Sequence, residues 1–438
     1  MQSIQQSAAP IRSAIPGQNG AGRQPLELAN WPFWKTVPRF TRESTTGDFL
    51  DSALSLWDSV EVPTGLERYF AAACAVKSVR TGREGLYLIL QALGLPRGSR
   101  VGVPLYCCDA VFMAIAAAGY VPIFLDIELD SYSLDPQSLW RNRETLDALI
   151  VVHTFGYPAN LARIQESLGD RDVPVIEDCA HSLFSDYLGM PTGSWTQAAF
   201  LTFGPHKPAA AGGGGILVIN NPAVASRIEF ATRSLEKPGK AEELRHAARS
   251  WVRGLGYKRG TYGALLAITS SEKRESRVNE AEHRAMTEGY TTLKVRGMRR
   301  VDRILVGERV RRFKLSLPAL AINAAAIRCA AADVSLCHLE EPAHGSWNHF
   351  MVPVRYGSEA LREAGRRFLR RHRVDTAALY GNCVRNAAFY GYRGGCPNAE
   401  FASRTVCTIP NHSWLSKAEM QHIRDSLRLS ATALKRSF

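Results

Sequence analysis

An amine and a carboxylate stand near the ends of two apolar segments of this chain. Lys207 lies in Phe200-Leu-Thr-Phe-Gly-Pro-His-Lys207 and precedes four glycines and an apolar run. Asp178 ends the segment Val175-Ile-Glu-Asp178 upstream. A lysine amine can form a Schiff base with an aldehyde, and a carboxylate can keep a pyridine nitrogen protonated. The pair therefore predicts a site for pyridoxal phosphate (PLP), provided that folding brings the two segments together.

Each of these residues also has an ordinary structural interpretation. Lysines are mostly exposed, and an aspartate after a strand often caps the next helix. His153 and His181 are equally typical of core histidines, and Thr202 of a strand threonine. The order of these residues along the chain, more than any one of them, indicates a site.

Strand and helix signals alternate along most of the chain, which predicts an α/β fold. Continuous apolar runs are typical of strands covered by helices on both faces; they lie at 101–104, 121–125, 148–153, 174–177, 198–202 and 216–219. Polar residues follow several of these runs, at the sheet edge where α/β proteins bind ligands. Helices are predicted at 66–73, 86–93, 109–118, 360–371 and 416–434, and a further strand at 349–356. Helices joined by a mobile loop are expected in 233–300, apolar residues recur at helical spacing in the basic segment 296–314, and helical character continues through 319–332.

Length and composition limit the possible classes of protein. With 438 residues and 45% hydrophobic content, a large domain with a smaller companion is expected. The formal net charge of +13 favours anionic partners. The nine cysteines form no CxxC pair or zinc spacing, which predicts reduced thiols and no metal site. The longest apolar stretch, 110–125, is shorter than the ~20 residues of a spanning helix, so we expect a soluble protein.

The chain is expected to divide into three parts. Residues 1–25 are rich in Gln, Ser, Pro and Gly and predict a flexible tail. Residues 26–300 are assigned to a large domain with an aromatic N-terminal arm and a mobile, charged insertion around 233–295. Residues 301–438 are assigned to a small C-terminal domain.

The ordered motifs resemble the DegT/DnrJ/EryC1/StrS aminotransferases, fold-type-I PLP enzymes that mostly act on nucleotide-linked keto sugars. The resemblance extends from about residue 66 to 423 and is densest at 81–220. It includes Thr81-Gly-Arg-Glu-Gly-Leu86, Val103-Pro104, Val152-His-Thr-Phe-Gly-Tyr-Pro158, Ile176-Glu-Asp-Cys-Ala-His181 and Phe200-Leu-Thr-Phe-Gly-Pro-His-Lys207. It implies a large domain with a mainly parallel, mixed seven-stranded sheet and a smaller α+β C-terminal domain.

The same resemblance implies roles for individual residues. Lys207 matches the Schiff-base lysine, Asp178 the carboxylate on the pyridine nitrogen, and His181 the polar residue near the phenolic oxygen. The phosphate is expected to contact the hydroxyl of Thr202 and the helix start formed by Gly82, Arg83 and Glu84. The related dehydratases carry histidine where Lys207 aligns, and His206 falls one position earlier, so the alignment favours transamination.

Three departures from the family pattern concern the cofactor ring and the acceptor. The aromatic residue that usually stacks on the ring aligns with Cys108, and Tyr106, two positions earlier, is the predicted substitute. An Asn-Tyr-Arg-Met-like stretch is not recognisable in 233–300. The His-containing acceptor segment is not found after Tyr380.

The predicted function is a PLP-dependent aminotransferase that moves an amino group, with glutamate as the expected donor, to a nucleotide-linked keto sugar. Such a reaction serves polysaccharide or secondary-metabolite sugar biosynthesis. A cytoplasmic homodimer is expected, without nucleic-acid or membrane partners. A PLP-dependent dehydratase and a non-catalytic PLP-binding regulator of the same fold are the alternatives. A nucleic-acid-binding protein would suit the arginines of 296–312, but no recognition motif supports it.

Overall fold

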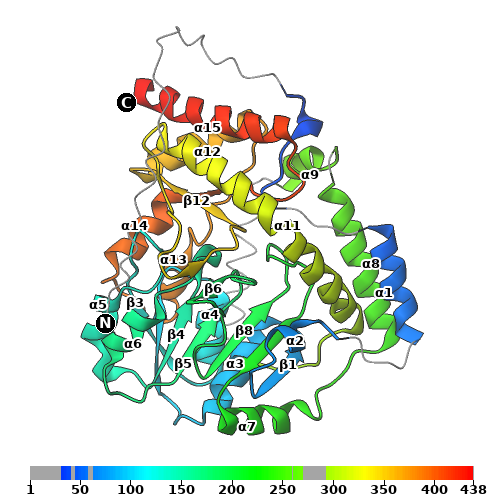
Figure 1. Ribbon diagram of the computed structural model, residues 1–438, viewed down its shortest axis with the longest axis vertical. Coiled ribbons are helices and arrows are strands. Elements are labelled where there is room, and N and C mark those ends of the chain that lie inside the picture. Colours follow the sequence, from blue (N-terminus) through cyan, green and yellow to red (C-terminus); the bar gives the residue numbers. More distant parts are fainter. Residues whose placement is uncertain (1–30, 41–44, 58–62, 259, 270–292, 438) are drawn as a thin grey trace, which may run out of the picture.

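The computed structural model describes residues 31–40, 45–57, 63–258, 260–269 and 293–437. The predicted tail at 1–25 and much of the predicted mobile loop, 270–292, lie outside the described residues. A large domain built on one wide sheet lies below a smaller α+β domain in Figure 1. All nine cysteines are free thiols.

The central sheet has seven strands in the order β1-β9-β8-β5-β4-β2-β3. Only β9 runs against its neighbours, so the sheet is mixed but mainly parallel. The strands are β1 (Ala75–Val79), β2 (Arg100–Pro104), β3 (Val121–Leu125), β4 (Ala148–Val152), β5 (Val175–Asp178), β8 (Ala198–Thr202) and β9 (Gly215–Ile219). All except β1 match predicted strands, and β1 is half-buried and contains a lysine, so it lacked the apolar signal.

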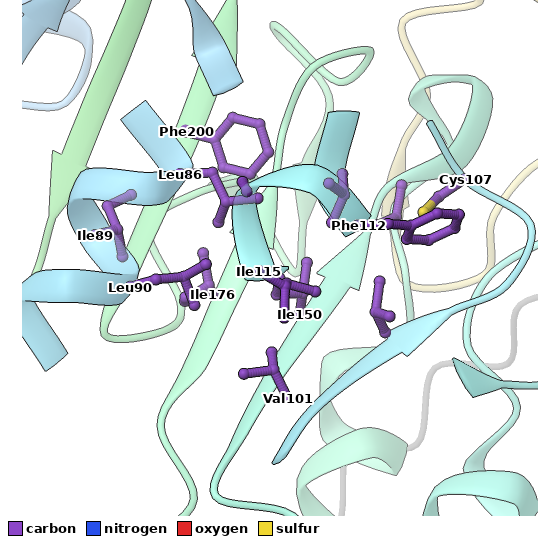
Figure 2. Close-up of a cluster of buried hydrophobic side chains, with 14 of the residues drawn as sticks. Leu86, Ile89, Leu90, Val101, Cys107, Phe112, Ile115, Ile150, Ile176 and Phe200 are labelled. Carbon is purple, nitrogen blue, oxygen red and sulfur yellow. The ribbon is translucent and has the colours of Figure 1, made fainter. Parts of the chain in front are cut away.

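Helices cover both faces of this sheet, which explains why its strands are apolar on both sides. One face packs against α3 (Gly82–Leu93), α4 (Asp109–Ala117) and α7 (Pro222–Thr232). Figure 2 shows Leu86 and Ile89 of α3 and Ile115 of α4 above Ile150 and Ile176 of the sheet. The other face is covered by α2 (Leu66–Tyr69), α5 (Pro136–Asn142), α6 (Leu161–Leu168) and the first half of α11 (Arg300–Ala332).

The small domain contains a three-stranded antiparallel sheet, β10-β12-β13, with helices against it. Its elements are β10 (Cys337–His338), β12 (Val352–Arg355), β13 (Val406–Ile409), α12 (Glu359–Arg371), α13 (Cys383–Ala388), α14 (Pro397–Thr405) and α15 (Lys417–Ser437). A capping box opens α15, because Ser416 and Glu419 exchange side-chain to backbone hydrogen bonds of 2.7 and 3.2 Å.

Three further groups of elements connect the two domains. A small sheet joins β6 (Asp186–Tyr187), β7 (Met190–Pro191) and β11 (Gly345–Ser346). The arm contains η1 (Phe33–Lys35), α1 (Thr46–Leu54) and η2 (Ser55–Trp57), and the insertion contains α8 (Lys240–Gly256) and α9 (Tyr262–Thr269). Short 3-10 turns complete the large domain as η3 (Arg143–Thr145) and η4 (Thr154–Gly156). The arm contacts both domains: Asp48 of α1 pairs with Arg309 in the first half of α11, whereas Val37 pairs with Val374 and Trp31 stacks on His422 of the small domain.

Helix α11 crosses from one domain to the other, as its diagonal course in Figure 1 shows. Leu305, Val306 and Val310 belong to the large-domain core, whereas Ala324 and Ile327 belong to the small-domain core. By length and composition α11 is apolar enough to cross a membrane. Its buried residues contribute to both cores, but only 28% of the apolar stretch is buried, and Leu315 and Ile322 are 69% and 70% exposed.

Candidate active site

The carboxyl ends of β5 and β8 bring the predicted amine and carboxylate into one site. Asp178 is the last residue of β5 and is buried. Lys207 lies in the turns after β8, where Ala211 N–H donates to the Phe203 carbonyl and closes the loop. The positive charge of Lys207 lowers the pKa of Asp178, although burial acts more strongly and raises that pKa above its usual value. The charge of Lys207 therefore acts on the Asp178 carboxylate at the carboxyl edge of the sheet.

His181 lies beside Lys207, with 3.1 Å between Lys207 Nζ and His181 Nε2. Burial, and then the lysine charge, hold the pKa of His181 well below its usual value, so the imidazole is neutral at pH 7. The ammonium then donates to Nε2, and we assign the ring proton to Nδ1. Nδ1 is buried and has no hydrogen-bond partner within the described part of the chain. A buried donor of this kind is available to an acceptor atom of a ligand.

The start of α3 and the side chain of Thr202 form a small cradle. Thr81 caps the helix by accepting from Glu84 N–H at 3.1 Å. A Cβ at Gly82 would lie 2.7 Å from Thr202 Cβ, so only glycine leaves this space open. The first amides of a helix and its positive end bind phosphate groups well. Gly82 and Thr202 therefore lie in close contact, and Arg83 follows Gly82 in the first turn of α3.

Glu84 has a second role that the sequence did not reveal. Its carboxylate is almost fully buried and accepts from Arg296 N–H at 2.8 Å and from the Arg296 guanidinium at 3.0 Å. These bonds fasten the segment before α11 to the first turn of α3. The carboxylate of Glu84 is engaged and negatively charged, and its backbone N–H donates to Thr81 Oγ1, so the structure leaves neither group of Glu84 free for the predicted phosphate contact.

The predicted ring-stacking residues are placed differently from one another. Cys108 caps α4 and lies close enough to Lys207 for its charge to act on the thiol. Tyr106 is fully buried, with its ring against Tyr132, Phe155 and Tyr380, and its hydroxyl donates to the Leu379 carbonyl. Tyr106 thus lies behind Tyr380 in the core rather than at the surface of the site.

Two residues outside the predicted set support the site from the small domain. Asn348 donates from Nδ2 to the carbonyls of His181 at 2.7 Å and Leu183 at 2.9 Å, which fixes the backbone of the site histidine. Tyr380 stacks over His181, with 6.0 Å between ring centroids and 17° between ring planes. A sequence signal for Asn348 is lacking, because its contacts are to backbone groups distant in the chain.

A pocket adjoins Lys207 on the side of α11. Its wall is formed by the loop 206–210, by Arg309, Arg312 and Phe313 of α11, and by residues 411–413 of the small domain. Arg309 pairs with Asp48 at 2.8 Å and Arg312 with Glu308 at 2.6 Å. Arginines of the predicted basic segment 296–312 are thus engaged within the fold, which weakens the nucleic-acid interpretation.

Comparison with known proteins identifies the family. A model of the DegT/DnrJ/EryC1/StrS aminotransferase family matches residues 60–293. The chain belongs to this family. Pyridoxal phosphate is the cofactor of the family, and the open cradle at Gly82 and the unpaired His181 Nδ1 fit its phosphate and its phenolic oxygen.

Among the relatives, the erythromycin biosynthesis sensory transduction protein EryC1 of Saccharopolyspora erythraea is 32% identical over 188 residues, which cover 42% of this chain and 50% of that protein. The GDP-perosamine synthase of Escherichia coli O157:H7 is 30% identical over 151 residues, or 34% of this chain and 42% of the relative. The chain spans about half the length of the curated relatives it matches.

Solved structures resemble the whole fold more completely. The sugar aminotransferase CalS13 of Micromonospora echinospora aligns with a TM-score of 0.67 over 90% of this chain and 99% of its own, at 20% identity. The putative sugar aminotransferase Spr1654 of Streptococcus pneumoniae aligns with a TM-score of 0.70 over 92% and 99%, at 17% identity. At these identities the likeness shows the fold, which is the predicted fold type I.

Proposed function

We propose that this protein is a PLP-dependent aminotransferase that moves an amino group from an amino-acid donor, with glutamate expected, to a keto sugar carried on a nucleotide. The observation that carries the proposal is the meeting of Lys207, Asp178 and His181 at the carboxyl edge of the sheet. The names of relatives such as GDP-perosamine synthase support the substrate class. We place the reaction in the cytoplasm, in a homodimer, and in the synthesis of polysaccharides or secondary metabolites.

Each residue of the site has a definite task in this proposal. PLP supplies, when bound, an aldehyde that accepts the donor's amine and a ring that draws electrons away from the donor's α-carbon. Asp178 holds a proton at the ring nitrogen, and His181 orients the phenolic oxygen. Lys207 binds the cofactor and then carries a proton between the donor's α-carbon and the cofactor. The α3 amides and Thr202 hold the phosphate.

The pocket beside Lys207 provides room for an acceptor. It opens between the two domains and is lined by aromatic, hydroxyl and amide side chains, a composition that suits a sugar with polar groups. Arg309 and Arg312 already pair with carboxylates. We therefore expect hydrogen bonds, more than net charge, to select the acceptor.

Borohydride reduction of the PLP-loaded protein tests the cofactor part of this proposal. We expect a pyridoxyl group on Lys207 in the wild type and none at this position in Lys207→Ala, as read by peptide mass spectrometry. A separate, unreduced sample of the PLP-loaded protein should convert the bound cofactor to its amine form when incubated with glutamate, with release of 2-oxoglutarate. A protein whose reduced sample is labelled on Lys207, but whose unreduced sample fails with every amino donor, would instead favour the dehydratase or the regulator.

A further inference from the structure

The family pattern predicts an aromatic residue over the cofactor ring, shortly after the second strand of the large domain. Cys108 occupies the position after β2 where the family pattern predicts one. Its thiol lies 3.5 Å from Asp109 Oδ1, and burial raises the pKa of Cys108 to about 11, so the group is a neutral thiol. A thiol offers a much smaller flat surface than an aromatic ring. An aromatic residue that stacks on the pyridine ring must therefore come from another part of the protein.

Tyr380 of the small domain reaches this place. Its ring lies nearly parallel to that of His181, and it meets Tyr106 edge to face, with 5.4 Å between centroids and 88° between planes. Burial raises the pKa of Tyr380 well above its usual value, and the neighbouring Cys108 and Asp178 act in the same direction. The Tyr380 side chain therefore lies near Cys108, Asp178 and His181, and it is half-buried.

The turn that carries Tyr380 is held in an unusual conformation. Tyr380 has φ +57°, a left-handed value that costs energy for a residue with a side chain. The Tyr106 hydroxyl donates to the Leu379 carbonyl at 3.0 Å, and Cys383 N–H donates to the Tyr380 carbonyl at 3.0 Å. The core of the large domain thus fixes the position of a small-domain side chain. Such strain at a site is a reason to look for a function.

We propose that Tyr380 provides the aromatic wall of the cofactor cavity that Cys108 does not, so that the small domain completes the binding site for the pyridine ring. This inference rests on the proposed function, because it requires PLP at Lys207. Tyr106, predicted to stack on the ring itself, acts here as the support of Tyr380. Cofactor binding and small-domain position are consequently linked through one side chain.

Binding of PLP to the full-length protein tests this proposal without measuring turnover. We expect Tyr380→Leu to bind PLP about tenfold more weakly, since aromatic stacking and the buried ring area together contribute about 1.4 kcal/mol. The visible circular dichroism of the bound cofactor should fall with it, because a wall of its chiral surroundings is removed. Tyr380→Phe, which keeps the ring, should bind PLP as the wild type does. Phe389→Leu, at an exposed aromatic of the same domain, is the matched control.

A rescue experiment makes the test specific. The double variant Cys108→Phe with Tyr380→Leu should recover most of the affinity, because an aromatic ring returns to the same cavity. Tyr106→Phe, which keeps the core ring but removes the hydroxyl that holds Leu379, should weaken binding about threefold, and this variant serves if Tyr380→Leu does not fold.

Unchanged affinity and circular dichroism in Tyr380→Leu, or in Tyr106→Phe where the former does not fold, would overturn the proposal. Failure of the wild type to be labelled on Lys207 would remove the proposed function and this inference together. If the wild type is labelled on Lys207 but Tyr380→Leu binds PLP as tightly as the wild type, only this inference is removed.

Discussion

Glu177 and Asp178 are neighbours on β5, both buried, and their side chains project to opposite faces of the sheet. Glu177 accepts hydrogen bonds from the backbone N–H groups of Gly193, Trp195 and Thr196 at 2.7 to 3.1 Å, and pairs with His153 at 2.9 Å. Asp178 accepts from Ala180 N–H at 2.9 Å and otherwise faces the charge of Lys207. A saturated carboxylate fastens the fold, and an incompletely bonded one is available to a ligand.

Neutralising each carboxylate in turn is the strongest test of this difference. In Asp178→Asn the ring nitrogen would lose its negative partner, so we expect the first half-reaction with the amino donor to slow by about a hundredfold or more. The free energy of unfolding should change little, because a buried charge is removed while the amide oxygen can keep the hydrogen bond from Ala180 N–H. Stopped-flow absorbance and urea unfolding measure the two quantities. A fast half-reaction in this variant would contradict the assignment of Asp178.

Glu177→Gln should show the reverse behaviour. The amide has one acceptor oxygen where the carboxylate has two, so buried N–H groups are left unsatisfied at a cost of about 2–4 kcal/mol in the free energy of unfolding. The half-reaction of the folded fraction should remain close to that of the wild type. Equal loss of stability in both variants would abolish the distinction between the two faces.

Gly82→Ala tests the cradle at the start of α3. The added Cβ would lie 2.7 Å from Thr202 Cβ, so either the threonine or the helix must shift. We expect PLP to bind about tenfold more weakly, since displaced donors lose their hydrogen bonds to phosphate. Thr202→Val, which is matched in shape but lacks the hydroxyl, should give a smaller loss, of about threefold. Equilibrium titration by absorbance compares the two variants.

The pH dependence of stability gives the smallest expected effect. The pKa of His181 in the folded protein lies well below that of the unfolded chain, so the unfolded state binds more protons as the pH falls. The contribution of His181 to stability is therefore complete above about pH 7 and is lost as the pH drops below about 6.5. Between pH 7 and 5.5 the cofactor-free wild type should lose about 1 kcal/mol more than His181→Gln. Urea unfolding at several pH values measures this difference. If the wild type and His181→Gln lose the same free energy of unfolding between pH 7 and 5.5, the lowered pKa of His181 is contradicted.

The sequence predicted the sheet well because its strands are covered on both faces and are apolar throughout. The order of Asp178, Thr202 and Lys207 was enough to place the amine and the carboxylate at one edge. The strand β1 was missed because Lys77 lies on a half-buried strand with no apolar run. The sequence also did not show that Glu177 is saturated with hydrogen bonds and Asp178 is not. That difference depends on the loop 193–196, whose backbone N–H groups donate to Glu177 on one face of the sheet.

The contribution of the small domain to the site lay beyond sequence reasoning for a related reason. Tyr380 is 199 positions from His181, and the turn that joins them in space depends on Tyr106 in a third segment. The left-handed backbone at Tyr380 has no marker in the sequence, because glycine or asparagine would be the usual signal. Patterns within one segment reveal the elements, whereas the site depends on contacts between segments.

Helix α11 has a practical consequence for anyone who wishes to divide this protein. A cut at residue 301 would give the C-terminal fragment Leu305, Val306, Val310 and Phe313, all of which fill the sheet-side core of the other fragment. The first fragment would then expose the apolar surface of β8 and β9 to water and would be prone to aggregate. Because the two domains share core residues on α11, we expect neither to fold when it is expressed alone.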